Sequence, residues 1–174
     1  MSRRSIAAAL VVSAALLGGC AQLPGTAATV DGARVTEGDV ADATQDFEQL
    51  LGSAPNAVAV VDALVKEKVV TPVAAEYGIT ASDAQVVDYF GEYSASTGAE
   101  PLEEFSEAGL QVGRYLYLMG EAQLSEDAMG ISEDMLAAFE AADIEVSDRY
   151  GAYNEGGELL PVEHPWLKTF NAAQ

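Results

Sequence analysis

Histidine and cysteine, the residues that most often carry catalysis and zinc binding, are almost missing from this chain. Its 174 residues include one cysteine, Cys20, and one histidine, His164. A single cysteine excludes a disulfide within the chain, and one cysteine with one histidine is too few ligands for a typical zinc site. A Ser-His-Asp triad would depend on His164, which stands beside Pro165 in an acidic stretch. We therefore expect no catalytic site and no metal site.

Basic residues are also scarce. The chain has 8 Lys and Arg against 28 Asp and Glu, a formal net charge of -20. So acidic a surface repels nucleic acids and anionic lipid headgroups, and it is typical of a solvated exterior. No glycine-rich loop follows a predicted strand, and no D-x-D-x-D-G calcium loop occurs. We expect no cofactor, no nucleic acid partner and no small-molecule substrate.

The first residues have the layout of an export signal. Arg3 and Arg4 precede an apolar run from residue 6 to residue 17, and two glycines follow it. The run is too short to cross a bilayer as a helix, so residues 1–19 are predicted to be a signal peptide. The sequence does not decide between the general secretion and twin-arginine export routes.

The end of this segment, Leu17-Gly18-Gly19-Cys20, resembles a bacterial lipobox. The resemblance implies cleavage before Cys20 and a diacylglycerol on its thiol. Two acyl chains are what stable membrane anchoring needs. We expect the protein to be held at the extracytoplasmic face of the cell membrane, with residues 20–27 as a linker. The alternative is an ordinary signal peptide with an unmodified cysteine.

Beyond the linker, hydrophobic periodicity and capping residues predict a mainly α domain of about five helices. Asp31-Gly32, between β-forming residues, predicts a hairpin turn, and Thr36 with Asp39 predicts a capping box at the start of the first helix. A second capping box is expected at Ser82. The helices are expected over residues 36–51, 57–77, 82–93, 110–125 and 133–142.

Several local features are less regular. Pro72 should kink the second helix or begin a new turn capped by Thr71. Pro101 is expected to open a short helical piece, and Ser132 to cap the fifth helix. Ile144 to Val146 reads as a strand, and a Gly-Gly turn with an irregular tail over residues 155–174 should follow.

Three stretches in order carry a second resemblance: "ATVDGARVTEGDV", "ALVKEKVVTPVAAEYGITASDAQV" and "IEVSDRYGAYN". Residues 28–154 resemble the N-terminal helical domain of SurA and trigger-factor-like chaperones, and in particular short SurA-type lipoproteins. The resemblance implies one helical domain whose N-terminal and C-terminal strands join in a small β element, with Arg149-Tyr150-Gly151 in the late strand. Residues 124–133 leave no room for the prolyl isomerase domain of longer relatives, so no isomerase activity is expected.

The helix over residues 110–124 is apolar on two sides. Leu110, Tyr117 and Leu124 lie on the side opposite Val112 and Met119. A helix that is apolar all round is normally buried, here beneath the C-terminal strand and tail. The other interpretation is that Leu110, Tyr117 and Leu124 stay exposed and contact a client polypeptide.

Two functions follow as hypotheses. The first is a membrane-anchored lipoprotein with chaperone-like binding of unfolded secreted or envelope polypeptides. The second is an adaptor for one envelope protein, without general chaperone activity. An enzyme is not expected, because the chain lacks the residues for the usual site chemistries. Fold resemblance alone does not decide between these functions.

Overall fold

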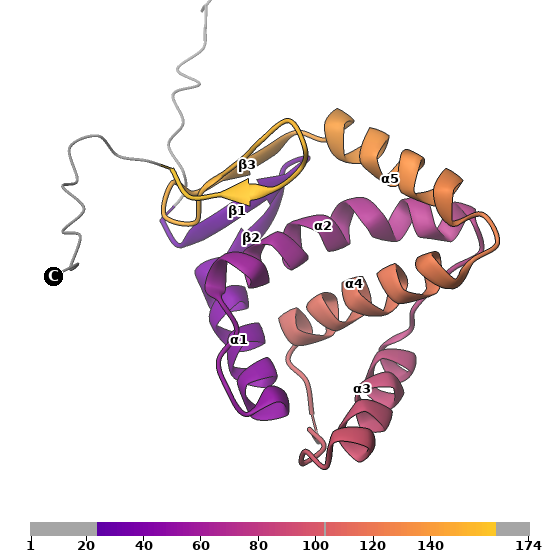
Figure 1. Ribbon diagram of the computed structural model, residues 1–174. Coiled ribbons are helices and arrows are strands. Elements are labelled where there is room, and N and C mark those ends of the chain that lie inside the picture. Colours follow the sequence, from indigo (N-terminus) through magenta and orange to yellow (C-terminus); the bar gives the residue numbers. More distant parts are fainter. Residues whose placement is uncertain (1–23, 103, 163–174) are drawn as a thin grey trace, which may run out of the picture.

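A computed structural model describes residues 24–102 and 104–162, and within them the chain is mainly helical (Figure 1). Five helices pack together, and a small antiparallel sheet closes one end, as the sequence predicts. The helices are α1 (Glu37–Leu51), α2 (Ala57–Glu76), α3 (Asp83–Thr97), α4 (Glu107–Leu124) and α5 (Ala128–Ala141). The strands are β1 (Thr26–Val30), β2 (Ala33–Thr36), β3 (Ile144–Val146), β4 (Ala152–Tyr153) and β5 (Leu159–Leu160).

The sheet joins the two ends of the described chain in the strand order β2-β1-β3. The predicted turn between β1 and β2 is present: Asp31 and Gly32 both have positive φ, 49° and 78°, as a tight hairpin turn requires. β3 pairs antiparallel with β1, with Val30 opposite Ile144. The expected contact between the N-terminal strands and residues 144–146 is therefore confirmed. The predicted linker overlaps this sheet, because Thr26 and Ala27 already belong to β1 and are buried.

Most helix ends lie where the capping residues predict them. The Thr36–Asp39 and Ser82–Gln85 capping boxes both form. Beyond the end of α2, Gly78 has a φ of 75° and the Ile79 N–H donates to the carbonyl of Ala74 at 2.9 Å, a glycine-terminated helix end.

Pro72 does not begin a new helix. α2 continues through it, and Thr71 lies inside the helix with its hydroxyl donating to Glu67 Oε1 at 3.3 Å. Two buried residues precede Pro72 and two follow it, and they hold this part of α2 in place: Val69, Val70, Val73 and Ala74. Their burial outweighs the hydrogen bond that proline cannot make.

Several predicted boundaries are wrong. α3 continues to Thr97, four residues past the expected end at residue 93. Leu102 and residues 104–106 are not helical, Phe105 is buried in the core, and α4 begins after Ser106, three residues before the expected start at residue 110. Ser132 does not cap α5, which begins at Ala128, so Ser132 lies inside the helix. The reason is Ile131, which is 0% exposed and extends the buried stripe of α5 one turn toward its start.

The C-terminal region also differs from expectation. Asp148 to Tyr150 form a turn rather than a strand, and the Tyr150 hydroxyl donates to Glu37. The predicted tail contains β5, which pairs with β4 around Gly156 and Gly157. A side chain at Gly151 would collide with the carbonyl oxygen of Leu160, which explains the glycine there. Residues 163–174 lie outside the described residues.

The core has two parts. The closed core is built on β1, β2, α1, α3 and the first halves of α2 and α4. The second core lies between the last halves of α2 and α4 and helix α5. α4 is central, as expected of a helix apolar on two sides, but it is covered by α1, α2, α3 and α5 rather than by the C-terminal strand. None of the helices in residues 24–102 and 104–162 has the length and apolar character needed to cross a bilayer.

Candidate functional site

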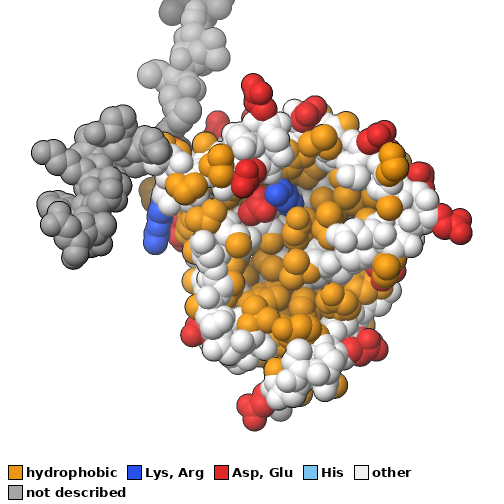
Figure 2. Space-filling model, in the orientation of Figure 1, with side chains coloured by type: hydrophobic (Ala, Val, Ile, Leu, Met, Phe, Trp, Pro, Cys, Tyr) orange, Lys and Arg blue, Asp and Glu red, His pale blue; other side chains and the backbone are white. Residues whose placement is uncertain are grey.

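An apolar groove of about 380 Å³ opens beside α5. Its walls come from α2, α4 and α5, and the turn between β4 and β5 borders one end, the hairpin end. We call it the α5 groove. Figure 2 shows hydrophobic side chains over the middle of the face that Figure 1 presents, more of them over α4 and toward α1 and α3 than beside α5, with acidic side chains around the margin. The main apolar lining residues of the groove are Val69, Val70, Tyr115, Met119, Ile131, Met135, Leu136 and Phe139.

The groove has a buried floor and an accessible wall. Ile131 and Met135 are buried in the second core, whereas Leu136 on the same helix is 48% exposed. Leu124 and Met129, at the connection from α4 to α5, are 83% and 79% exposed and extend the apolar surface beyond the groove. Methionine fills irregular space and adapts to different partners, so Met119 and Met135 suit a surface that accepts varied apolar groups.

α5 is fixed against its neighbours at both ends. Only the short segment from Ser125 to Asp127 joins it to α4, and β3 follows two residues after its last turn. Tyr77, at the end of α2, donates its hydroxyl hydrogen to Asp134 Oδ2 at 2.5 Å. That hydrogen bond raises the pKa of Tyr77 to about 12, because the neutral phenol is the donor. These contacts hold α5 beside α2 and α4.

One polar cluster stands at the hairpin end of the groove. Lys66 Nζ lies 2.9 Å from Asp62 Oδ2 and 6.0 Å from the ring centre of Phe139. The other oxygen of Asp62 accepts a hydrogen bond from Tyr153 at 2.9 Å. Burial, with the nearby Asp62 carboxylate, raises the pKa of both Tyr153 and Tyr115. Both tyrosines are neutral hydrogen-bonding groups at ordinary pH.

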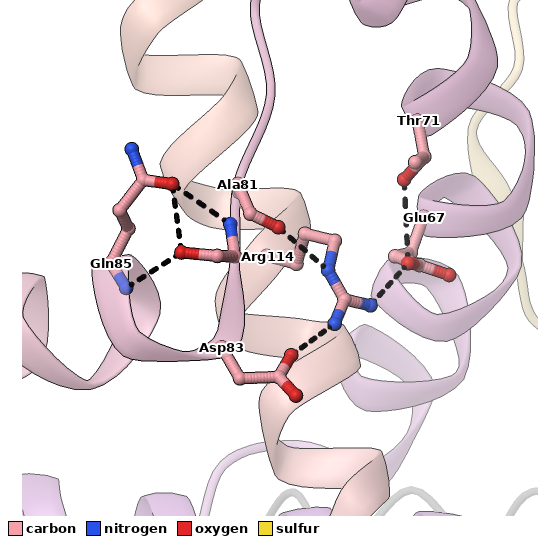
Figure 3. Close-up of polar contacts among 7 residues, drawn as sticks. Glu67, Thr71, Ala81, Asp83, Gln85 and Arg114 are labelled. Carbon is pink, nitrogen blue, oxygen red and sulfur yellow. Dashed lines mark hydrogen bonds and ion pairs between the residues drawn. The ribbon is translucent and has the colours of Figure 1, made fainter.

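A second polar network fixes the angle between α2, α3 and α4 (Figure 3). Arg114 on α4 reaches Glu67 Oε1 at 2.8 Å, Asp83 Oδ1 at 2.6 Å and the carbonyl oxygen of Ala81 at 3.3 Å. Glu67 is only 7% exposed, so its carboxylate needs this partner. Burial lowers the pKa of Arg114, but its hydrogen bonds to Glu67 and Asp83 outweigh burial and leave that pKa raised. The network positions the helices, and its residues are not part of the lining of the α5 groove.

The start of α4 is held by another buried acid. Asp46 on α1 is 8% exposed, and its Oδ2 accepts hydrogen bonds from the backbone N–H and the hydroxyl of Ser106, at 2.8 and 2.6 Å. A carboxylate is stabilised at a helix N-terminus by the helix dipole. Gly109 leaves room for Asp46, since a side chain there would collide with its carboxylate. Asp46 is explained by the fold and needs no ligand.

The three candidate client-contact residues do not form one exposed face. Leu110 is half-buried against the closed core. Tyr117 is half-buried against the second core and packs edge-on against Tyr89, with ring centres 5.6 Å apart. Leu124 alone is largely exposed, and none of the three lines the α5 groove. Cys20 and the lipobox residues Leu17, Gly18 and Gly19 lie outside the described residues, as does His164.

The phenylalanine rings of α1 and α3 are not an open surface either, although Tyr89 and Tyr93 on α3 are 43% and 40% exposed. Phe47, Phe90 and Phe105 are 5%, 6% and 9% exposed and pack together, with Phe47 and Phe90 ring centres 5.4 Å apart. These rings form the closed core, so they offer nothing to a partner.

Sequence reasoning missed the groove because it began α5 too late. Starting the helix at residue 133 leaves out Ile131 and Met129, and with them the pattern that places an apolar face toward α4. The signal was present: Ile131, Met135, Ala138 and Phe139 recur at helical spacing.

The chemistry that the groove offers is apolar contact with a few hydrogen-bonding groups. The polar side chains of its lining, taken from the described residues, are one lysine, one glutamine, one serine and one tyrosine, and the lysine is paired with Asp62. In the same residues, no cluster of three or more histidine, cysteine, aspartate or glutamate side chains is placed to hold a metal ion. An apolar groove of this kind suits the side chains of a bound polypeptide.

Comparisons with known proteins find no match for this chain, whether among protein-family models, curated proteins or solved structures.

Proposed function

We propose that this protein binds unfolded or partner polypeptides in a chaperone-like manner, with the α5 groove as its binding surface. The observation that carries the proposal is the contrast on α5 itself, where buried Met135 stands next to Leu136, 48% exposed at the groove. Leu124 and Met129 enlarge the apolar surface beside it. Apolar surface left open next to a well-packed core is typical of an interaction site. The resemblance to SurA-type domains points the same way.

The protein is also proposed to be a lipoprotein, anchored through diacylglycerol on Cys20 at the extracytoplasmic face of the membrane. The lipobox-like residues 17–20 support this placement. Replacing Cys20 with serine should release the protein from membranes or stall its processing, while the helical body stays folded. A processed Cys20→Ser chain that still fractionates wholly with membranes would refute the anchor.

Polypeptide binding is tested by the suppression of aggregation of an unfolded substrate, followed by light scattering. Leu136→Asp puts a charge in the groove and should remove the suppression. Leu51→Asp is the matched control, because Leu51 on α1 is 47% exposed and does not line the groove. Equal activity of the two variants would show that the groove is not the binding surface.

The adaptor function uses the same groove for one envelope protein. It is separated from general chaperone activity by crosslinking in membranes through a photoreactive residue at position 136. Many crosslinked polypeptides support chaperone-like binding, and a single one supports the adaptor.

A further inference from the structure

Exposed acidic residues adjoin, in the sequence, the residues that line both ends of the α5 groove. At the end formed by the start of α5, Glu126 and Asp127 directly precede the lining residue Ala128. At the hairpin end, Glu155 and Glu158 flank the lining glycines 156 and 157, and Glu140 follows Phe139 on α5. All five carboxylates are on exposed residues. A ligand that fills the apolar centre therefore places its two ends among carboxylates.

Positive charge does not balance this rim. Lys66 is the one basic residue among the groove's described lining residues, and Asp62 lies 2.9 Å from its ammonium group. Lys66 also lies over the ring of Phe139, so its ammonium group already interacts with a carboxylate and an aromatic ring of the protein itself. The potential at the two mouths of the groove is therefore negative, in keeping with the net charge of -20 for the whole chain.

We propose that the α5 groove selects apolar polypeptide segments that carry lysine or arginine on both sides. This inference rests on the proposed polypeptide binding and names the class of client. The apolar centre of the segment contacts Met119, Leu136 and Phe139, and its flanking cations meet the carboxylates at the two mouths. Complementary charges raise the rate of encounter, and like charges penalise segments flanked by aspartate or glutamate.

The centre of the groove and its rim contribute differently to binding. Two methionines make the apolar contact tolerant of different side-chain shapes, so the centre of the groove discriminates weakly among apolar sequences. The rim carboxylates attract positively charged flanks of the segment, whatever the shape of its apolar side chains. Selection by the flanks combined with tolerance at the centre lets one groove accept many segments of a single electrostatic class.

The test uses three labelled peptides with one apolar core and different flanks: two lysines, two serines or two glutamates on each side. Binding to the full chain is followed by fluorescence anisotropy at low and high salt. The lysine-flanked peptide should bind most tightly and the glutamate-flanked peptide most weakly. Their difference should shrink as salt rises toward about 1 M, where the screening length falls to roughly 3 Å.

Rim variants locate the effect. Glu140→Gln combined with Glu155→Gln should weaken binding of the lysine-flanked peptide by about two- to fivefold for each carboxylate removed, and should leave the serine-flanked peptide unchanged. The control is Glu48→Gln with Glu92→Gln, two exposed residues on α1 and α3 that make the same change in net charge. The control pair should change the affinities little.

The outcomes separate this inference from the function beneath it. Equal binding of all three peptides, abolished by Leu136→Asp, overturns charge selection and leaves polypeptide binding standing. Equal losses from the rim and control pairs also overturn it, because net charge alone would then explain the preference. Binding of none of the peptides overturns the proposed function. Self-association of the chain that Leu136→Asp abolishes assigns the groove to a second copy and overturns the inference.

Discussion

The two halves of the α2–α4 helix pair bury their apolar side chains in different ways. In the closed core, three phenylalanine rings interlock with Leu64, which is 0% exposed, and helices cover them. In the second core, Ile131 and Leu118 are as deeply buried, but Leu136 beside them is half exposed and the groove stays open. The same pair of helices thus supports a region built for stability and a region that leaves apolar surface free for contact. Variants in the two regions should therefore affect different measurements.

The largest effect is expected from Phe90→Ala in the closed core. Phe90 contacts Phe47 and Phe105, and removal of its ring leaves a cavity that these neighbours cannot fill. Unfolding in urea should show a loss of about 3–5 kcal/mol in the free energy of unfolding. The remaining folded protein should bind peptide with unchanged affinity, because the groove lies at the other end of α4. A loss below about 1 kcal/mol would contradict a tightly packed closed core.

The contrast between the two regions also explains what the sequence could predict. Caps, the Asp31-Gly32 turn and the apolar stripe of α1 are local signals, and they placed the hairpin and most helix boundaries correctly. The start of α5 depends on a tertiary contact, because Asp127 and Ser132 are both residue types that cap helices. Burial of Ile131 against the second core decides between them. The groove could not be predicted, since it exists only once α5 lies beside α2 and α4.

The next largest loss of stability is expected from the network of Arg114 with Glu67 and Asp83. Arg114→Met removes the partner of the buried Glu67 carboxylate and should cost about 3 kcal/mol of stability. The double variant Arg114→Met, Glu67→Met should recover much of that loss, because no buried charge remains. Asp83→Asn is the control, since the Asp83 side chain is 65% exposed and its pair with Arg114 contributes less than about 1 kcal/mol. Equal losses from Arg114→Met and Asp83→Asn would show that the buried carboxylate is not the reason.

Two glycines of α4 separate close packing from helix propensity. A Cβ at Gly113 would lie 2.5 Å from Val86 Cγ1 and 3.0 Å from the ring of Phe90, whereas Gly120 has nothing within 4 Å. Gly113→Ala should therefore destabilise the protein by about 1–3 kcal/mol, since α3 must move away. Gly120→Ala should stabilise it by about 0.5–1 kcal/mol, because alanine favours helix. Thermal unfolding of both variants measures the difference, and the same sign for both would mean that α3 and α4 are loosely packed.

The hydrogen bond between Tyr153 and Asp62, at the hairpin end of the groove, should have a smaller effect that depends on pH. Tyr153→Phe removes a bond to Asp62 and should cost about 1 kcal/mol. Folding raises the pKa of Tyr153 above its ordinary value of 10.0, through burial and Asp62. Its stabilising contribution is then complete below pH 10 and is lost as pH rises through the folded pKa. Urea unfolding between about pH 9 and pH 11 should show a steeper loss for the parent chain than for Tyr153→Phe.

The smallest change in stability is expected where the change in binding is greatest. Leu136 is 48% exposed, so Leu136→Asp should alter the free energy of unfolding by no more than about 0.5 kcal/mol while it abolishes peptide binding. Met135→Asp, one residue earlier on α5, puts its charge at a position that is 8% exposed and should lower stability by several kcal/mol. Adjacent residues would then separate into one that supports the fold and one that contacts the client. If Leu136→Asp destabilises the protein as much as Met135→Asp does, the α5 wall belongs to the core and the two regions no longer differ.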